Sequence, residues 1–347
     1  MKHVVTLTLN PALDKSTSVL RLLPDHKLAC ATPVVAPGGG GINVARGLRR
    51  LGLAARAVFP AGGPPGDQLC ELLLRENVVP QPVPIAAWTR ENLTVVDAST
   101  HQQYRFGMPG AALSPAEQAA LLATLAALRP VPGVLVASGS LPPGLAPAFV
   151  GKVAHWARKA GTRLVVDTSG EALQSAVEEG AYLLKPNLGE LSQLVGGAAL
   201  DSESAAEAAQ ALIARSRCDI VVVSLGAAGA CLVTRDVVEH IAAPAVKKLS
   251  TVGAGDSLVA GLVFALCQGR PVREAVRLGV ACGTAATMNP GTELFYQPDA
   301  ERLFQWLLQT MPRPVRAGNP PRASRALKEV KPQGNDVLLT EESGPKQ

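Results

Sequence analysis

Apolar strand-like segments alternate with helical segments through the middle of this chain, and no other feature of the sequence restricts the fold as strongly. Strand patterns at 133–137, 163–167 and 181–184 are separated by helical patterns at 147–159 and 171–178. Strands that alternate with helices form a parallel sheet covered by helices on both faces, so we predict an α/β fold. Similar patterns predict further strands at 4–9, 54–60, 220–224 and 230–234 and further helices at 66–77, 115–128, 187–195, 203–215, 271–288 and 298–310.

Two polar segments interrupt this alternation. Residues 17–37 are short, polar and broken by proline, and residues 92–107 have the pattern of a hairpin with no helix beside it. We predict that they pair as a small β-sheet lid formed by about residues 15–36 and 88–108. Because the open edges of such strands need cover, we expect the lid to be the interface of a homodimer.

Composition limits the possible partners. The 347 residues are 47% hydrophobic, which is enough for a large core, and only 3% aromatic, which disfavours a base-stacking surface. The formal charge of +5 is concentrated at the end, where residues 313–347 hold seven Lys or Arg and four Asp or Glu. The rest of the chain is then near +2. Nucleic acid is therefore not an expected partner.

Cysteine usage and the N-terminus indicate a reducing compartment. None of the six cysteines forms a CxxC pair, so we expect buried, reduced thiols in a cytoplasmic protein. The first ten residues have a strand pattern rather than that of a signal peptide, and no apolar segment reaches 18 residues, so we expect no membrane span. Residues 311–347 lack apolar periodicity, and we expect them to form a disordered tail after a domain at 1–310.

The stretch at 250–261 joins a glycine turn, a carboxylate and an apolar helix. Gly253, Ala254 and Gly255 let the backbone approach a ligand closely, and the helix expected at 257–267 would begin there with free N–H groups that attract anions. Asp256 beside an anion site either takes a proton from a nucleophile or caps the helix. The motif alone does not decide between these two roles.

A second glycine turn, at residues 37–41, enters a helix that we expect to end near Gly52. Its spacing places Val44 where a dinucleotide-binding turn needs its third glycine, so a Rossmann dinucleotide-binding fold is disfavoured. No GxxxxGK[ST] motif occurs, so a P-loop nucleotide site is disfavoured as well. Asn43, in the first helical turn, could bind the hydroxyls of a polyol or form a local helix-start hydrogen bond.

Two further motifs follow strands. Glu190, after Lys185-Pro186-Asn187, could hold Mg²⁺ through water, but a helix-start asparagine with a surface glutamate would have the same sequence. Residues 224–229, with Gly226 and Gly229, suit a nucleotide or a simple hairpin.

Together the two glycine motifs resemble the two signatures of the ribokinase-like phosphofructokinase B family of sugar kinases. The resemblance covers about residues 1–310 and is carried by GGGGINVAR, SGSLPPG, KPN and STVGAGDS at 38–46, 138–144, 185–187 and 250–257, with further support at 6–9 and 104–113. It implies a three-layer α/β/α sandwich with a mostly parallel sheet and a β lid. It also implies transfer of the ATP γ-phosphoryl group to the 1-hydroxyl of fructose 6-phosphate.

The resemblance also implies a role for individual residues. Asp256 would be the base, and Gly253, Ala254 and Gly255 would form an anion hole. The sugar hydroxyls would be bound by Asp14, Gly39 and Asn43, and the sugar phosphate by Lys27, Arg90, Arg105 and Ser140. ATP would be bound by Lys185, Asn187, Ser224, Gly226 and Gly229, Mg²⁺ by Glu190, and K⁺ by Ser250, Val252, Ala286, Asn289 and Gly291.

Two sequence differences, at Gly40 and Ala29, bear on the substrate, and a third, at Glu293, bears on the dependence on K⁺. Kinases of this family for tagatose 6-phosphate or fructose 1-phosphate usually carry Lys where this chain has Gly40, which favours fructose 6-phosphate. The branch that acts on fructose 6-phosphate carries Arg shortly after the lid lysine, where this chain has Ala29, and Arg where it has Glu293. Those two other sugar phosphates remain alternatives, and a regulatory protein that binds sugar phosphate and nucleotide without turnover is an alternative of another class.

Overall fold

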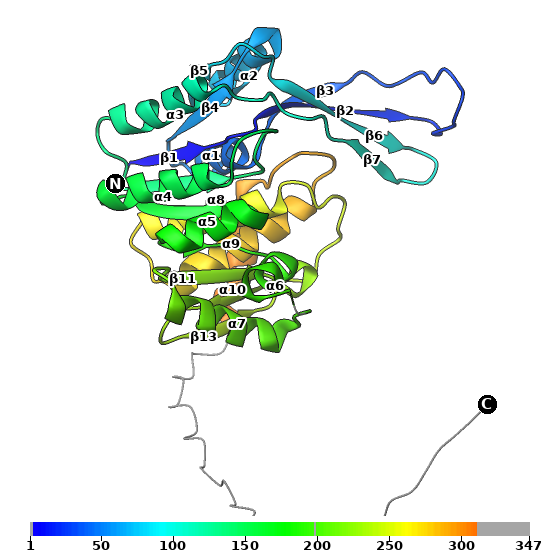
Figure 1. The fold of residues 1–347 in the computed structure, drawn as a ribbon. Helices are drawn as coiled ribbons and strands as arrows, with labels where there is room; N and C mark the ends of the chain where they lie inside the picture. Colours follow the sequence, from blue (N-terminus) through cyan, green and yellow to red (C-terminus); the bar gives the residue numbers. More distant parts are fainter. Residues whose placement is uncertain (1–2, 198, 311–347) are drawn as a thin grey trace, which may run out of the picture. The chain divides into compact units, whose positions relative to one another are not determined.

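A nine-stranded sheet runs through the part of the chain that this computed structural model describes, residues 3–197 and 199–310 (Figure 1). The predicted tail at 311–347 lies outside the described residues. From edge to edge the strands are β13 (Val238–Ile241), β12 (Ala230–Val233), β11 (Ile220–Ser224), β10 (Leu183–Leu184), β9 (Arg163–Asp167), β8 (Val134–Ser138), β1 (Val4–Leu7), β4 (Ala55–Ala61) and β5 (Val79–Pro84). The strands from β11 to β5 are parallel, and β12 and β13 are antiparallel to their neighbours.

Successive strand residues point to opposite faces of the sheet, and this alternation builds two cores. Val4 and Val134 contribute to one core, and their chain neighbours Val5 and Leu135 contribute to the other. The first core is covered by α1 (Gly40–Arg50), α2 (Gly63–Arg75), α8 (Ala254–Cys267), α9 (Val272–Thr287) and α10 (Gln297–Thr310). The second is covered by α3 (Pro115–Ala127), α4 (Ala148–Lys159), α5 (Gly170–Glu179), α6 (Leu188–Val195) and α7 (Ser202–Arg215).

A second sheet, the lid sheet, extends away from the large one (Figure 1). Its strands, in order, are β3 (Val34–Gly38), β2 (Ala12–Val19), β6 (Arg90–Asp97) and β7 (Gln103–Phe106). The β2–β3 and β6–β7 pairs are antiparallel, as predicted, whereas β2 and β6 pair in parallel. A parallel pair needs a long crossover, and the chain between β3 and β6 provides one through α1, β4, α2 and β5.

The three-layer α/β/α arrangement and the lid sheet confirm the predicted fold class, but three local predictions were wrong. β5 was missed because three of its six residues are proline, and an edge strand tolerates proline since only one side must pair. β13, the opposite edge strand, was also missed. α8 begins at Ala254 rather than at residue 257, so the glycine turn and Asp256 belong to its first turn.

The six cysteines, all within the described residues, form no disulfide. Cys218, Cys231 and Cys282 are buried, as expected, but Cys30 is exposed in the lid. Among the residues that the structure describes, no helix combines the length and apolar character needed to cross a membrane.

Candidate active site

Asp256 lies in the first turn of α8, three residues after the helix N-cap. The N-cap residue is Gly253, which has left-handed backbone angles (φ 72°, ψ 2°), a conformation that glycine adopts without steric cost. The first intrahelical bond runs from Ser257 N to Gly253 O at 2.8 Å. The N–H groups of Gly255 and Asp256 precede that bond, so they belong to the positive end of the helix that attracts anions.

The Asp256 carboxylate accepts a hydrogen bond from Asn43 Nδ2 at 2.9 Å. Burial and the neighbouring Asp167 raise the pKa of Asp256 to about 6, with a smaller rise from Asp14, while the Asn43 bond and Lys185 oppose the rise. A carboxyl with that pKa is deprotonated near neutral pH yet is a stronger base than an ordinary aspartate. The contact with α1 also argues against the helix-cap alternative for Asp256.

The four-glycine turn brings α1 against the ends of three strands. A Cβ atom at Gly38 would collide with the Asp14 carboxylate, and one at Gly40 would collide with Ser138 Oγ. At Gly41 it would lie 2.6 Å from Leu7 O. Gly39 is the N-cap of α1 with φ 109°. Small size is therefore required at these positions to hold Asn43 opposite Asp256.

Asp14 and Arg90 mark the lid side of the site. Asp14 Oδ1 accepts a bond from Asn92 Nδ2 at 2.8 Å, and burial raises the pKa of Asp14 above its usual value. Arg90 donates to Asn10 O at 3.0 Å and to Met108 O at 3.1 Å. Burial lowers the pKa of Arg90, and the nearby Asp14 carboxylate opposes this.

The other predicted sugar-phosphate residues are less tightly gathered. Ser140 Oγ accepts a bond from Asn10 Nδ2 at 3.1 Å, which places it beside the carbonyl that holds Arg90. Arg105 is exposed on β7 and donates to Gln103 at 3.3 Å. Lys27 is exposed in the loop between β2 and β3, and among the described residues it makes no polar contact with the other predicted residues. Sequence reasoning missed Asn10, which links two of the predicted residues.

Asp167 is the second residue of the site that sequence reasoning missed. It is the last residue of β9, and its Oδ1 lies 2.9 Å from Lys185 Nζ. Its other oxygen accepts a weak bond from Ser138 Oγ at 3.4 Å. The signal was present in the sequence, because Asp167 ends a predicted parallel strand at the edge where such sheets bind ligands.

Asn187 and Glu190 form a reciprocal cap on α6. Asn187 Oδ1 accepts from Glu190 N at 2.9 Å, and Glu190 Oε2 accepts from Asn187 N at 2.8 Å. This is the helix-start geometry that the sequence left open. Burial raises the pKa of Glu190, and Asp167 adds to this, while the bond from Asn187 and the charge of Lys185 oppose it.

The Ser224–Gly229 segment is the turn of the β11–β12 hairpin, containing the 3₁₀ turn η1 (Gly226–Ala228). Ser224 N donates to Pro186 O at 2.9 Å, so this turn lies beside the Asn187 segment. Gly229 has φ 101°, and a Cβ there would collide with Ile241 O. The backbone of the turn therefore requires glycine at position 229, whether or not a nucleotide binds there.

The predicted cation ligands lie on the 250–252 loop and at or just after the C-terminal end of α9, and a hydrogen bond joins the two segments. Ser250 Oγ donates to Gly291 O at 2.7 Å and accepts from Val252 N at 3.2 Å. Asn289 N donates to Ala286 O at 3.2 Å, and Asn289 Nδ2 donates to Leu294 O at 2.8 Å. Within residues 3–197 and 199–310, no group of three or more His, Cys, Asp or Glu side chains could hold a metal.

A carboxylate at a helix N-terminus, a buried lysine and strand-end polar residues on a parallel sheet are the features of a phosphoryl-transfer site. Residues 7–299 match the pfkB family carbohydrate kinase, and the chain belongs to this family.

Similar proteins refine this assignment. The chain is 43% identical to the ATP-dependent 6-phosphofructokinase isozyme 2 of Escherichia coli over 308 residues, which cover 88% of this chain and 99% of that protein. It is 32% identical to the 1-phosphofructokinase of Bacillus subtilis, with 85% and 96% covered. The crystal structure of the Escherichia coli phosphofructokinase-2 in complex with potassium aligns with a TM-score of 0.85 at 43% identity, covering 89% of this chain and all of that one. A ribokinase structure from Thermotoga maritima shares the fold (TM-score 0.70, 22% identity, 88% and 100% covered).

Proposed function

We propose that this chain transfers the γ-phosphoryl group of ATP to the 1-hydroxyl of fructose 6-phosphate, giving fructose 1,6-bisphosphate and ADP. The observation that carries the proposal is the Asp256 carboxylate, held by Asn43 at the N-terminus of α8 with its pKa near 6. The 43% identity to a 6-phosphofructokinase, against 32% to a 1-phosphofructokinase, supports the choice of substrate. A cytoplasmic location belongs to the same proposal, because both substrates are intracellular metabolites.

In this reaction the oxygen of the sugar 1-hydroxyl attacks the γ-phosphorus of ATP, Asp256 accepts the proton of that hydroxyl, and ADP leaves. The backbone of Gly253, Ala254 and Gly255, at the start of α8, donates to the charged oxygens of the transferred group. Lys185 adds a positive charge nearby: its Nζ lies 3.7 Å from the position that a Cβ of Gly255 would occupy. Positioning and charge stabilisation therefore account for most of the expected rate enhancement.

Fructose 6-phosphate would be bound between the glycine turn and the lid sheet. Asp14, Gly39 and Asn43 offer acceptors and donors to the hydroxyls. The phosphate would be bound by side chains from the lid and β8 loops, namely Lys27, Arg90, Arg105 and Ser140. Lys27 and Arg105 are exposed on the lid, so their charges are free to meet a phosphate.

Nucleotide and cations would be bound along the other half of the sheet. ATP would contact Lys185 and the two segments that Ser224 and Pro186 join, with Asn187, Gly226 and Gly229 along its phosphates and base. Mg²⁺ prefers oxygen ligands and keeps most of its waters, so Glu190 with the ATP phosphates fits it. It would neutralise charge on those phosphates. K⁺ suits the neutral oxygens near Ser250, Val252, Ala286, Asn289 and Gly291.

Gly40 supports fructose 6-phosphate over the two alternative sugars. A side chain at this position would collide with Ser138 Oγ and lie 2.8 Å from Gly139 N. A lysine there, as in the kinases for tagatose 6-phosphate or fructose 1-phosphate, would need a different backbone.

The test is ATP-dependent phosphorylation of fructose 6-phosphate, fructose 1-phosphate and tagatose 6-phosphate by the wild type and by Asp256→Asn. We expect the highest kcat/KM with fructose 6-phosphate and a loss of at least about a hundredfold in the variant. Asp236→Asn, an exposed aspartate in the β12–β13 turn, is the matched control. Unchanged turnover in Asp256→Asn, or no phosphorylation by the wild type, would contradict the proposal.

A further inference from the structure

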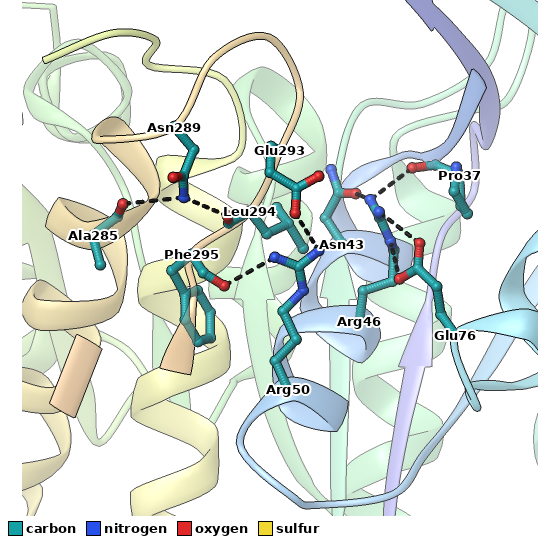
Figure 2. A network of polar contacts seen from close by, with 10 residues as sticks. All are labelled: Pro37, Asn43, Arg46, Arg50, Glu76, Ala285, Asn289, Glu293, Leu294 and Phe295. Carbon is teal, nitrogen blue, oxygen red and sulfur yellow. Dashed lines mark hydrogen bonds and ion pairs between the residues drawn. The ribbon is translucent and has the colours of Figure 1, made fainter. Parts of the chain in front are cut away.

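Arg46 is a buried arginine on α1, with 3% of its surface exposed. Its guanidinium makes four hydrogen bonds (Figure 2). Nε and Nη2 each donate to one carboxylate oxygen of Glu76 at 2.7 Å. Nη1 donates to Pro37 O at 3.0 Å and to Asn43 Oδ1 at 3.2 Å. A two-pronged ion pair of this kind fixes the plane of the guanidinium as well as its position.

The fixed guanidinium orients the amide of Asn43. A side-chain amide has one acceptor end and one donor end, and arginine can only donate. Arg46 lies three residues after Asn43 on the same helix face, so it selects the rotamer in which Oδ1 faces the guanidinium. The donor end then faces Asp256, with Nδ2 at 2.9 Å from its Oδ2. Glu76, Arg46, Asn43 and Asp256 thus form one chain of hydrogen bonds from the end of α2 to the start of α8.

We propose that Arg46 and Glu76 are positioning residues for Asp256, acting through the side-chain amide of Asn43. The proposal rests on the proposed function, because it concerns the base of that reaction. Neither residue touches the reacting atoms. Without Arg46, the amide is free to turn its oxygen toward the carboxylate, where it repels the charge instead of donating to it.

The groups around Asp256 predict the direction of the effect. Burial, Asp167 from β9 and Asp14 from β2 raise the pKa of Asp256, while the Asn43 bond and Lys185 lower it. When the Asn43 bond is lost, burial and the two carboxylates are opposed by Lys185 alone. Removal of Arg46 should therefore raise the pKa of Asp256. The acid limb of the pH profile, where kcat/KM falls at low pH, should then move to higher pH.

The experiment is a double-mutant cycle read by the pH dependence of kcat/KM for fructose 6-phosphate. We expect Arg46→Met to move the acid limb upward by about half a pH unit or more, a shift typical of losing one hydrogen bond to a carboxylate. In an Asn43→Ala background, the same substitution should produce no further shift. Arg277→Met is the matched control, because it removes an arginine that is 11% exposed and ion-paired to Glu239 on the distant β13. It should lower the melting temperature and leave the acid limb unchanged.

Two milder variants protect the test if Arg46→Met does not fold. Arg46→Lys keeps the charge but loses the fork, and Glu76→Gln keeps one acceptor for Arg46 but loses the second hydrogen bond and the ion pair. Each should move the acid limb of kcat/KM to higher pH by less than Arg46→Met does, and only when Asn43 is present. Equal shifts with and without Asn43, or loss of activity at an unchanged limb, would overturn the inference. Failure of the proposed function looks different, because the wild type itself would then not phosphorylate the sugar.

Discussion

Lys185 Nζ lies 2.9 Å from Asp167 Oδ1 in the interior of the candidate site, and the two side chains are 7% and 15% exposed. Burial alone would lower the pKa of Lys185, but the Asp167, Glu190 and Asp256 carboxylates outweigh burial and raise it. The lysine therefore stays charged at neutral pH. The same Asp167 carboxylate raises the pKa of Asp256. One strand-end aspartate thus affects the pKa values of both Lys185 and Asp256.

Asp167→Asn should lower the free energy of unfolding and also move the acid limb of kcat/KM to lower pH. A general loss of structure would not produce that second effect. Loss of one partner leaves a buried charge unpaired, which costs about 3 kcal/mol in the free energy of unfolding. Loss of the carboxylate also lowers the pKa of Asp256, so the acid limb of kcat/KM moves to lower pH. Denaturant unfolding and the pH profile check these two effects. With Asp236→Asn as control, an unchanged or raised limb would count against the coupling of Asp167 to Asp256.

Asp256→Asn should raise stability at neutral pH while it removes activity. The pKa of Asp256 is about 6 in the folded chain against an ordinary value of 3.8, so the folded state binds more protons between these values. Its contribution to stability is full below about pH 4 and is lost as the pH rises through 6. The neutral asparagine avoids that loss, and a gain of up to about 3 kcal/mol is expected at pH 7. At pH 4 the two proteins should unfold at similar denaturant concentrations, and a gain that does not depend on pH would contradict this origin.

Sequence reasoning predicted most of the architecture because the elements in the middle of the sheet have clear periodicity. The strand at 163–167 was predicted with the bounds that the structure has, Arg163–Asp167. The errors fall on edge strands, where proline-rich β5 needs pairing on one side only. They also fall on the start of α8, where glycines weaken the helix signal but form its first turn.

The candidate site was predictable where a motif combines turn geometry with chemistry, as at Asn43 and Asp256. It was not predictable where a role depends on which residues meet in space. Glu76 lies 30 residues after Arg46 at an ordinary helix end, and only the folded chain brings its carboxylate to 2.7 Å from Arg46 Nε. Glu293 is a similar case, because its partner Arg50 is 243 residues away.

Gly41→Ala should destabilise the fold although it adds a single methyl group. Its Cβ would lie 2.6 Å from Leu7 O and from Thr8 Oγ1, and backbone atoms in a central strand cannot move aside cheaply. Overpacking of this kind costs about 1 to 3 kcal/mol. Gly107→Ala is the matched control, because no atom lies within 4 Å of its added Cβ. Denaturant midpoints should fall for the first variant only, and equal midpoints would show that the turn can widen.

The lid sheet should form a homodimer interface, because it exposes large apolar side chains. Val34 on β3 is 65% exposed and Phe106 on β7 is 46% exposed. Light scattering of the wild type should give the mass of a dimer, and Phe106→Asp should shift the mass toward a monomer, since burial of a charge in an apolar interface is unfavourable. Val131→Asp, at 46% exposure outside the lid, should leave the mass unchanged. A fully active wild-type monomer would refute the lid interface.

Glu293→Gln should increase the dependence on K⁺, because Glu293 helps to fix the loop that holds the proposed cation ligands. Arg50 Nη2 lies 2.6 Å from Glu293 Oε1, and Arg50 Nη1 donates to Phe295 O at 2.9 Å (Figure 2). Asn289 Nδ2 donates to Leu294 O within the same loop. Without the ion pair, more of the ordering of this loop must come from the cation itself, so we expect half-maximal activation at several-fold higher K⁺ and a larger rise in melting temperature on K⁺ addition.

The titration should keep ionic strength constant with tetramethylammonium, so that screening does not change with K⁺. Glu71→Gln is the matched control, because it removes an exposed ion pair with Arg75 on α2. Pairs of that kind contribute little to stability, so its K⁺ response should match that of the wild type. If Glu293→Gln also matches the wild type in both activation and melting temperature, the Arg50–Glu293 pair does not support the cation loop.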